Sequence, residues 1–119
     1  MSAYRDFVVL VCGGRDFNDW AMFNQAMSSL PKKPSLIVHG DAPGADTMAK
    51  LWAKSNGIYP VAIPELWNTY GKPAGNKRNM AMALIMNPDY VVAFPGGTGT
   101  DDMVSVAEEM AITVWRPYL

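Results

Sequence analysis

The sequence predicts an α/β protein in which one doubly wound parallel sheet carries helices on both faces. Short apolar runs alternate with helix-length segments along the 119 residues. The runs at residues 7–12 and 91–94 are apolar at every position instead of at every second one, which is typical of strands buried on both faces. Three of them end in the glycine-rich segments GGRDF, HGDAPGAD and PGGTGT. The alternation predicts parallel strands joined by helices, and the length suits a single domain over residues 1–119.

Five apolar runs are the predicted strands. The first is rich in valine, and Pro95 and Pro117 follow the last two, where proline prevents further ladder bonds. We expect the spatial order 3-2-1-4-5, which places the first strand at the centre of the sheet. In chain order the strands cover residues 7–12, 35–39, 59–63, 90–94 and 112–115.

Four segments between these runs are the predicted helices. Asn18 or Asp19 can cap the first, Gly57 suits the C′ position after the second, and Thr98 or Thr100 can cap the fourth. In chain order the helices cover residues 19–30, 45–56, 75–86 and 100–110.

The three glycine-rich segments follow the first, second and fourth predicted strands. Because the carboxyl ends of parallel strands meet at one edge of a sheet, all three segments face the same edge. With the order 3-2-1-4-5, the turns after the first and fourth strands flank the point where the strand order reverses. Ligands bind at that point in open α/β sheets, so the sequence predicts a ligand cleft there.

The segment PGGTGT has the features of a phosphate cradle. Its glycines permit a sharp turn and close approach of a ligand, and the next helix N-terminus offers unpaired N–H groups at its positive end. It is neither a Walker A motif nor a GxGxxG fingerprint, and a tight turn without ligand is the alternative. The predicted ligand-binding residues here are Pro95, Gly96, Gly97, Thr98, Gly99, Thr100 and Asp101.

The first turn, GGRDF, adds a cation at the same edge. Gly13 and Gly14 are predicted to bind ligand together with Arg15, whose guanidinium can clamp a phosphate through two hydrogen bonds. The alternative for Arg15 is a surface salt bridge with Asp16 or Asp19. Asp16 is included in the predicted site, where orienting Arg15 or capping a turn is its expected role.

The second turn supplies His39, Gly40, Gly44, Ala45 and Asp46 to the predicted site. The imidazole of His39 can donate to a ligand or act as an acid–base group, or it can bond to a neighbouring turn. Asp46 lies in the first turn of the second helix, where capping is the leading interpretation. Contact with ribose hydroxyls is the alternative, because a carboxylate can accept two such hydrogen bonds.

A basic segment precedes the third predicted helix. Lys72 and Arg78 lie in or next to the irregular connection at residues 64–73 and can close over phosphate groups. Asn79 can read the edge of a base or sugar. Trp67 and Tyr70 can stack on a base, although large aromatic side chains are more often core or interface residues.

Composition limits the partners. The net charge is −1 and the pI is about 5.7, so no global basic field attracts duplex nucleic acid. The apolar run at residues 7–12 is too short for a signal peptide or a membrane span, and one cysteine fits a reducing compartment, so we expect a cytoplasmic protein without membrane contact. Four tryptophans in a short chain favour a homo-oligomer.

Metal binding is expected only through a ligand. One histidine and one cysteine cannot assemble a zinc site. Carboxylates together with a bound phosphate can hold Mg²⁺, and we predict no other cofactor.

Four segments together resemble the SLOG superfamily of Rossmann-like domains, and most closely its YspA-type, cpYpsA-related branch: VCGGRDF, VHGDAPGAD, WNTYGKPAGNKRN and DYVVAFPGGTGTDDM. They occur in the family's order over nearly the whole chain. The resemblance implies a domain that binds or processes nucleotide derivatives, including NAD- or ADP-ribose-like molecules. The superfamily also contains molybdenum-cofactor carrier proteins, DNA-processing proteins similar to DprA, and the lonely-guy phosphoribohydrolases.

Lonely-guy enzymes cut the N-glycosidic bond of cytokinin nucleotides and carry PGGxGT followed by paired glutamates. In this chain Asp102 aligns with one glutamate, and Met103 replaces the other. The first hypothesis is therefore a binding domain for a phosphorylated nucleotide derivative, with Asp46 and Asp102 at the ribose. The second is a nucleoside 5′-monophosphate phosphoribohydrolase with Asp102 and Arg78 as catalytic residues, and the third is a single-stranded nucleic-acid module.

Overall fold

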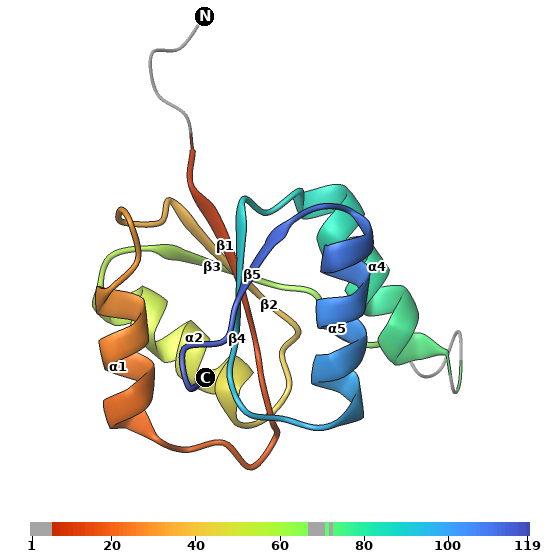
Figure 1. Ribbon diagram of the computed structural model, residues 1–119, viewed down its shortest axis with the longest axis horizontal. Coiled ribbons are helices and arrows are strands. Elements are labelled where there is room, and N and C mark those ends of the chain that lie inside the picture. The colour runs from red at the N-terminus through yellow and green to blue at the C-terminus, as the bar shows by residue number, and fades with distance from the viewer. Residues whose placement is uncertain (1–5, 67–70, 72) are drawn as a thin grey trace, which may run out of the picture.

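The computed structural model describes residues 6–66, 71 and 73–119, and these residues form one five-stranded parallel sheet (Figure 1). The strands are β1 (Val8–Cys12), β2 (Leu36–His39), β3 (Tyr59–Ala62), β4 (Tyr90–Ala93) and β5 (Thr113–Trp115). The helices are α1 (Trp20–Ser28), α2 (Ala45–Ser55), α4 (Ala74–Met86) and α5 (Thr98–Glu109).

The strand order is β3-β2-β1-β4-β5, as the sequence predicts. The central strand β1 pairs with β2 on one side and with β4 on the other, so that Leu10 lies opposite Val38 and Val91. The order reverses between β1 and β4. The predicted doubly wound, Rossmann-like α/β class is confirmed.

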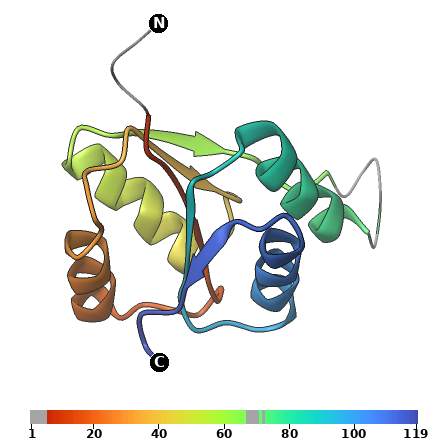
Figure 2. The same ribbon diagram turned by 45° about the horizontal axis from the view of Figure 1, so that its top comes forward.

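Helices cover both faces of the sheet (Figure 2). α1 and α2 pack on one face over Val9, Val11 and Ile37, and α4 and α5 pack on the other face over Leu10 and Val38. Alternate residues of β1 therefore enter different cores, which explains why its sequence is apolar at every position.

Helix α5 begins two residues earlier than the sequence predicts. Its N-cap is Gly97, and neither Thr98 nor Thr100 caps it, so the prediction of a threonine cap is wrong. The helix begins directly after the glycine turn, which places both threonines inside its first turn. The first helix, α1, behaves as predicted, because the Asp19 carboxylate accepts a hydrogen bond from the Met22 N–H at 3.0 Å.

Helix α4 leaves apolar side chains on the surface. Leu84 is 62% exposed and Ile85 76% exposed, in the last turns of a helix whose other face is core. The expected self-association stays a prediction. Among the described helices, none is both long enough and apolar enough to cross a membrane.

Candidate functional site

A cleft of about 650 Å³ lies at the carboxyl ends of the strands. The turns after β1, β2 and β4 line it together with the middle of α4, so the structure places the three glycine-rich segments at one edge. The predicted residues that line the cleft are Gly13, Gly14, Arg15, Asp16, Gly40, Asp46, Arg78, Asn79, Pro95, Gly96, Gly97, Thr98, Gly99 and Thr100. The predicted residues outside its lining are His39, Gly44, Ala45, Asp101 and Asp102.

The turns after β1 and β4 touch through their backbones. The Gly14 N–H donates to the Pro95 carbonyl oxygen at 2.8 Å. A Cβ on Gly14 would lie 2.9 Å from that oxygen, and a Cβ on Gly96 would lie 2.7 Å from the Gly14 nitrogen. These two glycines are therefore needed for contact between the turns, whether or not a ligand binds.

The N-terminus of α2 is covered by the turn after β1. Gly44, its N-cap, has φ +80°, and a Cβ there would overlap the Gly14 carbonyl oxygen. The same oxygen accepts a hydrogen bond from the Ala45 N–H at 3.1 Å. Gly44 and Ala45 therefore build the wall behind the cleft and do not reach its surface.

The N-terminus of α5 is open. The N–H groups of Thr98, Gly99 and Thr100 donate to no acceptor among the described residues, whereas the Asp101 N–H bonds to the Gly97 carbonyl. A Cβ on Gly97 or on Gly99 would meet nothing within 4 Å. Three N–H groups at the positive end of a helix dipole thus lie beside free space at the cleft.

Arg15 lies at the same cleft with its charge unpaired. Its side chain is exposed, and within the described part of the chain its guanidinium makes no hydrogen bond or ion pair. The salt bridge to Asp16 or Asp19, which was the alternative interpretation, does not form. The Asp19 carboxylate caps α1 instead.

Asp46 is a buried carboxylate in the cleft wall. The residue is 6% exposed, and its Oδ2 accepts hydrogen bonds from the N–H groups of Gly40 at 3.0 Å and Ala42 at 3.2 Å. It therefore fastens the turn after β2 and does not cap its own helix. Burial raises the pKa of Asp46 to about 6, against the effect of those N–H groups and of the nearby Arg78 charge.

His39 does not line the cleft. It is buried, and its Nδ1 accepts a hydrogen bond from the Asp41 N–H at 3.0 Å. Burial lowers the pKa of His39, which keeps the imidazole neutral. Of its two predicted roles, the structure shows the bond to a neighbouring turn.

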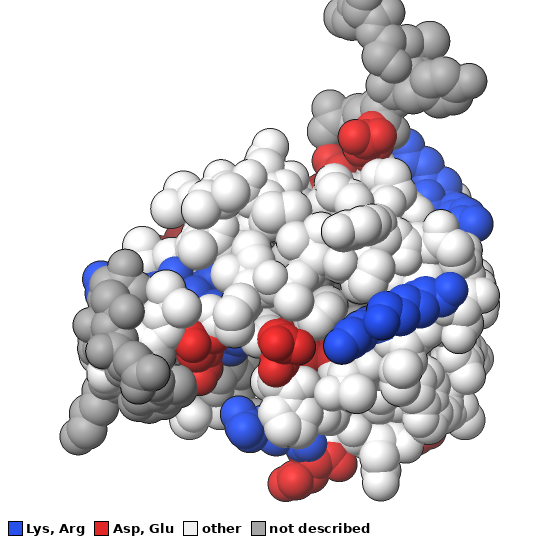
Figure 3. All heavy atoms as spheres, turned by 180° about the vertical axis from the view of Figure 1, so that it is seen from behind, with Lys and Arg blue, Asp and Glu red and all other residues white. Residues whose placement is uncertain are grey.

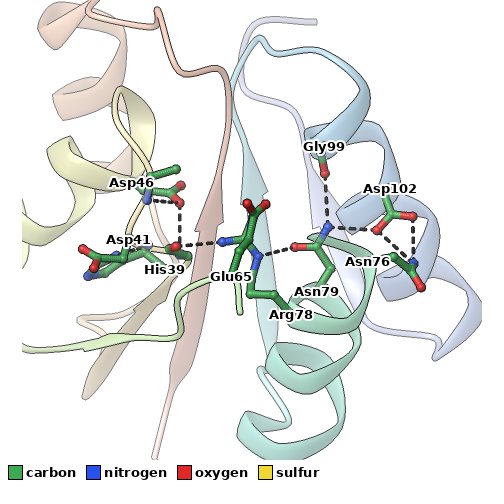
Figure 4. Close-up of polar contacts among 11 residues, drawn as sticks. His39, Asp41, Asp46, Glu65, Asn76, Arg78, Asn79, Gly99 and Asp102 are labelled. Carbon is green, nitrogen blue, oxygen red and sulfur yellow. Dashed lines mark hydrogen bonds and ion pairs between the residues drawn. The ribbon is translucent and has the colours of Figure 1, made fainter. Parts of the chain in front are cut away.

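Arg78 crosslinks three segments of the chain (Figure 4). Its Nη1 donates to the Gly40 carbonyl at 2.7 Å, its Nε to the Asn79 side-chain oxygen at 2.9 Å, and its Nη2 to Glu65 at 3.2 Å. A Cβ on Gly40 would overlap this guanidinium. Arg78 lines the cleft, but its geometry is that of a residue that positions the turn after β2.

Asp102 points toward α4 (Figure 4) and does not line the cleft. The Asn76 amide donates to both of its oxygens, at 2.9 and 3.1 Å, and the Asn79 amide donates to Oδ2 at 2.9 Å. Asn79 also donates to the Gly99 carbonyl at 3.3 Å. The carboxylate with the predicted catalytic role therefore holds α4 against α5.

Sequence reasoning missed Glu65, Phe17 and Met82 as lining residues of the cleft. Glu65 could have been found, because the third strand also ends at this edge and Glu65 follows it closely. Phe17 packs on the Phe94 ring at a centroid distance of 5.1 Å, and Met82 is on the buried face of α4. Only tertiary packing identifies these two as cleft residues.

Lys72, Trp67 and Tyr70 lie outside the described residues. Within those residues, no three His, Cys, Asp or Glu side chains gather as metal ligands. Burial raises the pKa of the Cys12 thiol to about 12, which makes this cleft residue a poor nucleophile.

Two comparisons with known proteins agree with this architecture. A model of the YspA, cpYpsA-related SLOG family matches residues 7–70. The chain is also similar to the "Gene 61 protein" of Mycobacterium phage D29, with 34% identity over 118 residues, which covers 89% of this chain and 92% of the phage protein.

Proposed function

The chain belongs to the YspA, cpYpsA-related SLOG family, and from that premise and the geometry of the cleft we propose that it binds a small phosphorylated nucleotide derivative. Family membership favours nucleotide-related binding or processing in general. The finer proposal is that the phosphate of the ligand lies at the N-terminus of α5. A cleft of about 650 Å³ is within the size range of small-molecule sites.

The observation that carries the proposal is the free space at Gly97 and Gly99. Gly13, Gly14, Gly40, Gly44 and Gly96 are each explained by a protein atom that a Cβ would meet. Gly97 and Gly99 have no such neighbour, and neither has a positive φ. Glycine in a helix costs about 0.5–1 kcal/mol relative to alanine, so Gly99 needs another explanation. Close approach of a phosphate to the main chain is the explanation we propose.

Charge supports the same placement. Arg15 is an exposed cation at the cleft without a partner in the described part of the chain, and a guanidinium binds phosphate through two parallel hydrogen bonds. On the face seen in Figure 3, basic and acidic side chains are scattered and form no continuous basic band. A local phosphate site is therefore a better match to this charge distribution than a nucleic-acid groove.

No contact at the cleft favours the alternative phosphoribohydrolase mechanism. Both the binding and the hydrolase hypotheses placed Asp102 at the ribose, but Asp102 does not line the cleft, and both of its oxygens accept hydrogen bonds from the amides of Asn76 and Asn79. Binding, and not Asp102-dependent hydrolysis, is the function that the contacts support.

Isothermal titration calorimetry with AMP, ADP-ribose and NAD tests the proposal, with adenosine as the ligand without phosphate. We expect AMP to bind and adenosine to bind at least tenfold more weakly. Gly99→Ala and Arg15→Ala should each weaken AMP binding by roughly tenfold or more, since the first fills the free space and the second removes the cation.

Two substitutions away from the cleft are the matched controls. Gly57→Ala is a second glycine-to-alanine change with no atom within 4 Å, and Lys50→Ala removes an exposed cation from α2. Both should leave AMP binding unchanged. The proposal is wrong if none of the phosphorylated ligands binds at millimolar concentration, or if adenosine binds as tightly as AMP.

A further inference from the structure

The two ends of the cleft differ in their hydrogen-bonding character. At the α5 end, main-chain N–H groups and Arg15 offer donors. At the opposite end, next to α2, the wall contains the Asp46 carboxylate (Figure 4). A ligand that fills the cleft therefore meets donors with one part and a charged acceptor with the other.

Asp46 has one carboxylate oxygen to spare. Its Oδ2 accepts both hydrogen bonds from the turn after β2, and no described residue donates to Oδ1. In the described part of the chain, no fully buried side-chain oxygen or nitrogen lacks a partner. The Oδ1 atom of this nearly buried residue is therefore accessible, and the surface that Asp46 lines is the cleft.

Arg78, the cation that acts on Asp46, is shared with other groups. Arg78 is the nearby cation, but it is already in an ion pair with Glu65 at 3.2 Å and also donates to Gly40. Asp46 itself makes no ion pair among the described residues. A second phosphate would meet the charge of the Asp46 carboxylate, which Arg78 offsets only in part, whereas a hydroxyl group would find an acceptor.

We propose that Asp46 makes the site specific for ligands with a free ribose 2′,3′-diol beside the phosphate. Its accessible oxygen accepts hydrogen bonds from the diol, and its charge excludes ligands that carry a phosphate at that position. The inference rests on the proposed function, since the phosphate at α5 sets the position of the ribose. It narrows the ligand class to 5′-phosphorylated ribosides with unmodified hydroxyls.

Three ligands test the inference on the unmodified protein by calorimetry: AMP, 2′,3′-dideoxy-AMP and adenosine 3′,5′-bisphosphate. All three carry the 5′-phosphate, and they differ only at the diol. We expect the dideoxy compound to bind roughly tenfold to hundredfold more weakly than AMP, because a charged acceptor loses its donors. The bisphosphate should bind at least as weakly, since its added charge faces Asp46.

Asp46→Asn identifies the group responsible. The amide oxygen can still accept from Gly40 and Ala42, but the charge is gone, so the bisphosphate should gain at least tenfold in affinity relative to AMP. Glu108→Gln is the matched control, because it removes an equal charge from an exposed residue outside the cleft lining and should leave the ratio unchanged. Where Asp46→Asn does not fold, the ligand series on the unmodified protein decides.

The outcomes separate this inference from the proposed function. Equal affinities for AMP, dideoxy-AMP and the bisphosphate, with AMP binding still weakened by Gly99→Ala, overturn the role of Asp46 and leave the phosphate site in place. An unchanged ratio in Asp46→Asn has the same consequence. Absence of binding by all three ligands overturns this inference, and it overturns the proposed function as well only where ADP-ribose and NAD also fail to bind.

Discussion

The N-termini of α2 and α5 lie at the same edge of the sheet, and both follow glycine-rich turns. The turn after β1 packs against the N-terminus of α2, whereas the N-terminus of α5 lies beside free space at the cleft. At α2, the Gly14 carbonyl accepts a hydrogen bond from the Ala45 N–H and also from the Phe17 N–H at 3.2 Å. At α5, the Thr98 N–H at the corresponding position has no acceptor in the described part of the chain. The next two N–H groups have none among those residues at either helix, so the ends differ in this first N–H and in the turn that covers α2. Both helix ends follow glycine-rich turns, but only the end of α2 is covered by another turn of the chain.

The glycines differ in the same way. Gly44 at α2 has a positive φ and lies against the Gly14 carbonyl, so protein geometry alone requires it. Gly97 and Gly99 at α5 have neither constraint. A glycine-rich turn therefore indicates a ligand only when the chain itself does not use the missing side chain, and this distinction depends on contacts remote in sequence.

The largest effect is expected from Gly44→Ala. The methyl group would overlap the Gly14 carbonyl, and alanine is strained at φ +80°, so we expect a loss on the order of 4 kcal/mol in the free energy of unfolding. Gly57→Ala is the matched control, because φ is +68° there but nothing lies within 4 Å. It should cost only about 1 kcal/mol.

Urea denaturation followed by circular dichroism measures both variants. If Gly44→Ala costs no more than Gly57→Ala, the backbone contact between the turn after β1 and α2 is not tight. The N-terminus of α2 would then be no more tightly covered by the chain than the N-terminus of α5.

The sequence was sufficient to predict which segments meet at the cleft. Strand order and the shared carboxyl edge follow from local patterns, since apolar runs and glycine turns are visible without tertiary contacts. The turns after β1, β2 and β4 line one cleft for this reason. The prediction of a threonine cap was wrong because α5 begins directly after the glycine turn, at Gly97. A glycine N-cap has no side chain, so the sequence contains no capping residue that marks this start.

Side-chain partners could not be predicted in the same way. Arg78 bonds to Gly40, 38 residues away, and Asp102 bonds to Asn76 and Asn79 on a different helix. Which of several nearby polar groups a side chain reaches depends on how α4 lies against α5, and no local pattern encodes that arrangement. The position of the cleft could therefore be predicted from the sequence. Which of its polar residues hold the turns together and which are free to contact a ligand could not be predicted.

The second largest effect on the free energy of unfolding is expected from the side chain that holds the N-terminus of α5 in place. Asn79 is 2% exposed and joins α4 to the Gly99 carbonyl and to Asp102. Asn79→Ala should cost roughly 2–4 kcal/mol, because several buried polar groups lose their partners. Asn76→Ala removes an exposed donor to the same Asp102 and should cost below about 1 kcal/mol. Equal losses in urea denaturation would show that α5 is not fixed through Asn79.

The stability of the protein is also expected to depend on pH through Asp46, in the first turn of α2. Burial raises its pKa to about 6 in the folded protein, above the unfolded value near 3.9, so the folded state binds this proton more tightly. Its contribution to stability is therefore present at low pH and is lost as the pH rises through 6. Asp46→Asn carries no such proton, so it should gain roughly 1–3 kcal/mol relative to the unmodified protein between pH 4 and 7.

Thermal unfolding of both proteins across this pH range measures that difference. His39 titrates with the opposite sign, because burial lowers its pKa and stability is lost as the pH falls through its unfolded value. Both proteins contain His39, so its effect cancels in the difference. A pH-independent difference would mean that the Asp46 carboxylate is well solvated.

The smallest effect on the free energy of unfolding is expected from Gly99→Ala in the absence of ligand. Its sign is opposite to that of Gly44→Ala. Gly99 is in the first turn of α5, where alanine favours the helix and the added methyl group meets no atom within 4 Å. The free energy of unfolding should therefore rise by about 0.5 kcal/mol, as measured by urea denaturation, although the same change weakens AMP binding. A protein that is stabilised by a substitution that impairs its binding site is trading stability for function at that position. A loss of stability above about 1 kcal/mol would instead show that the chain itself needs glycine there, and the two helix ends would then be alike.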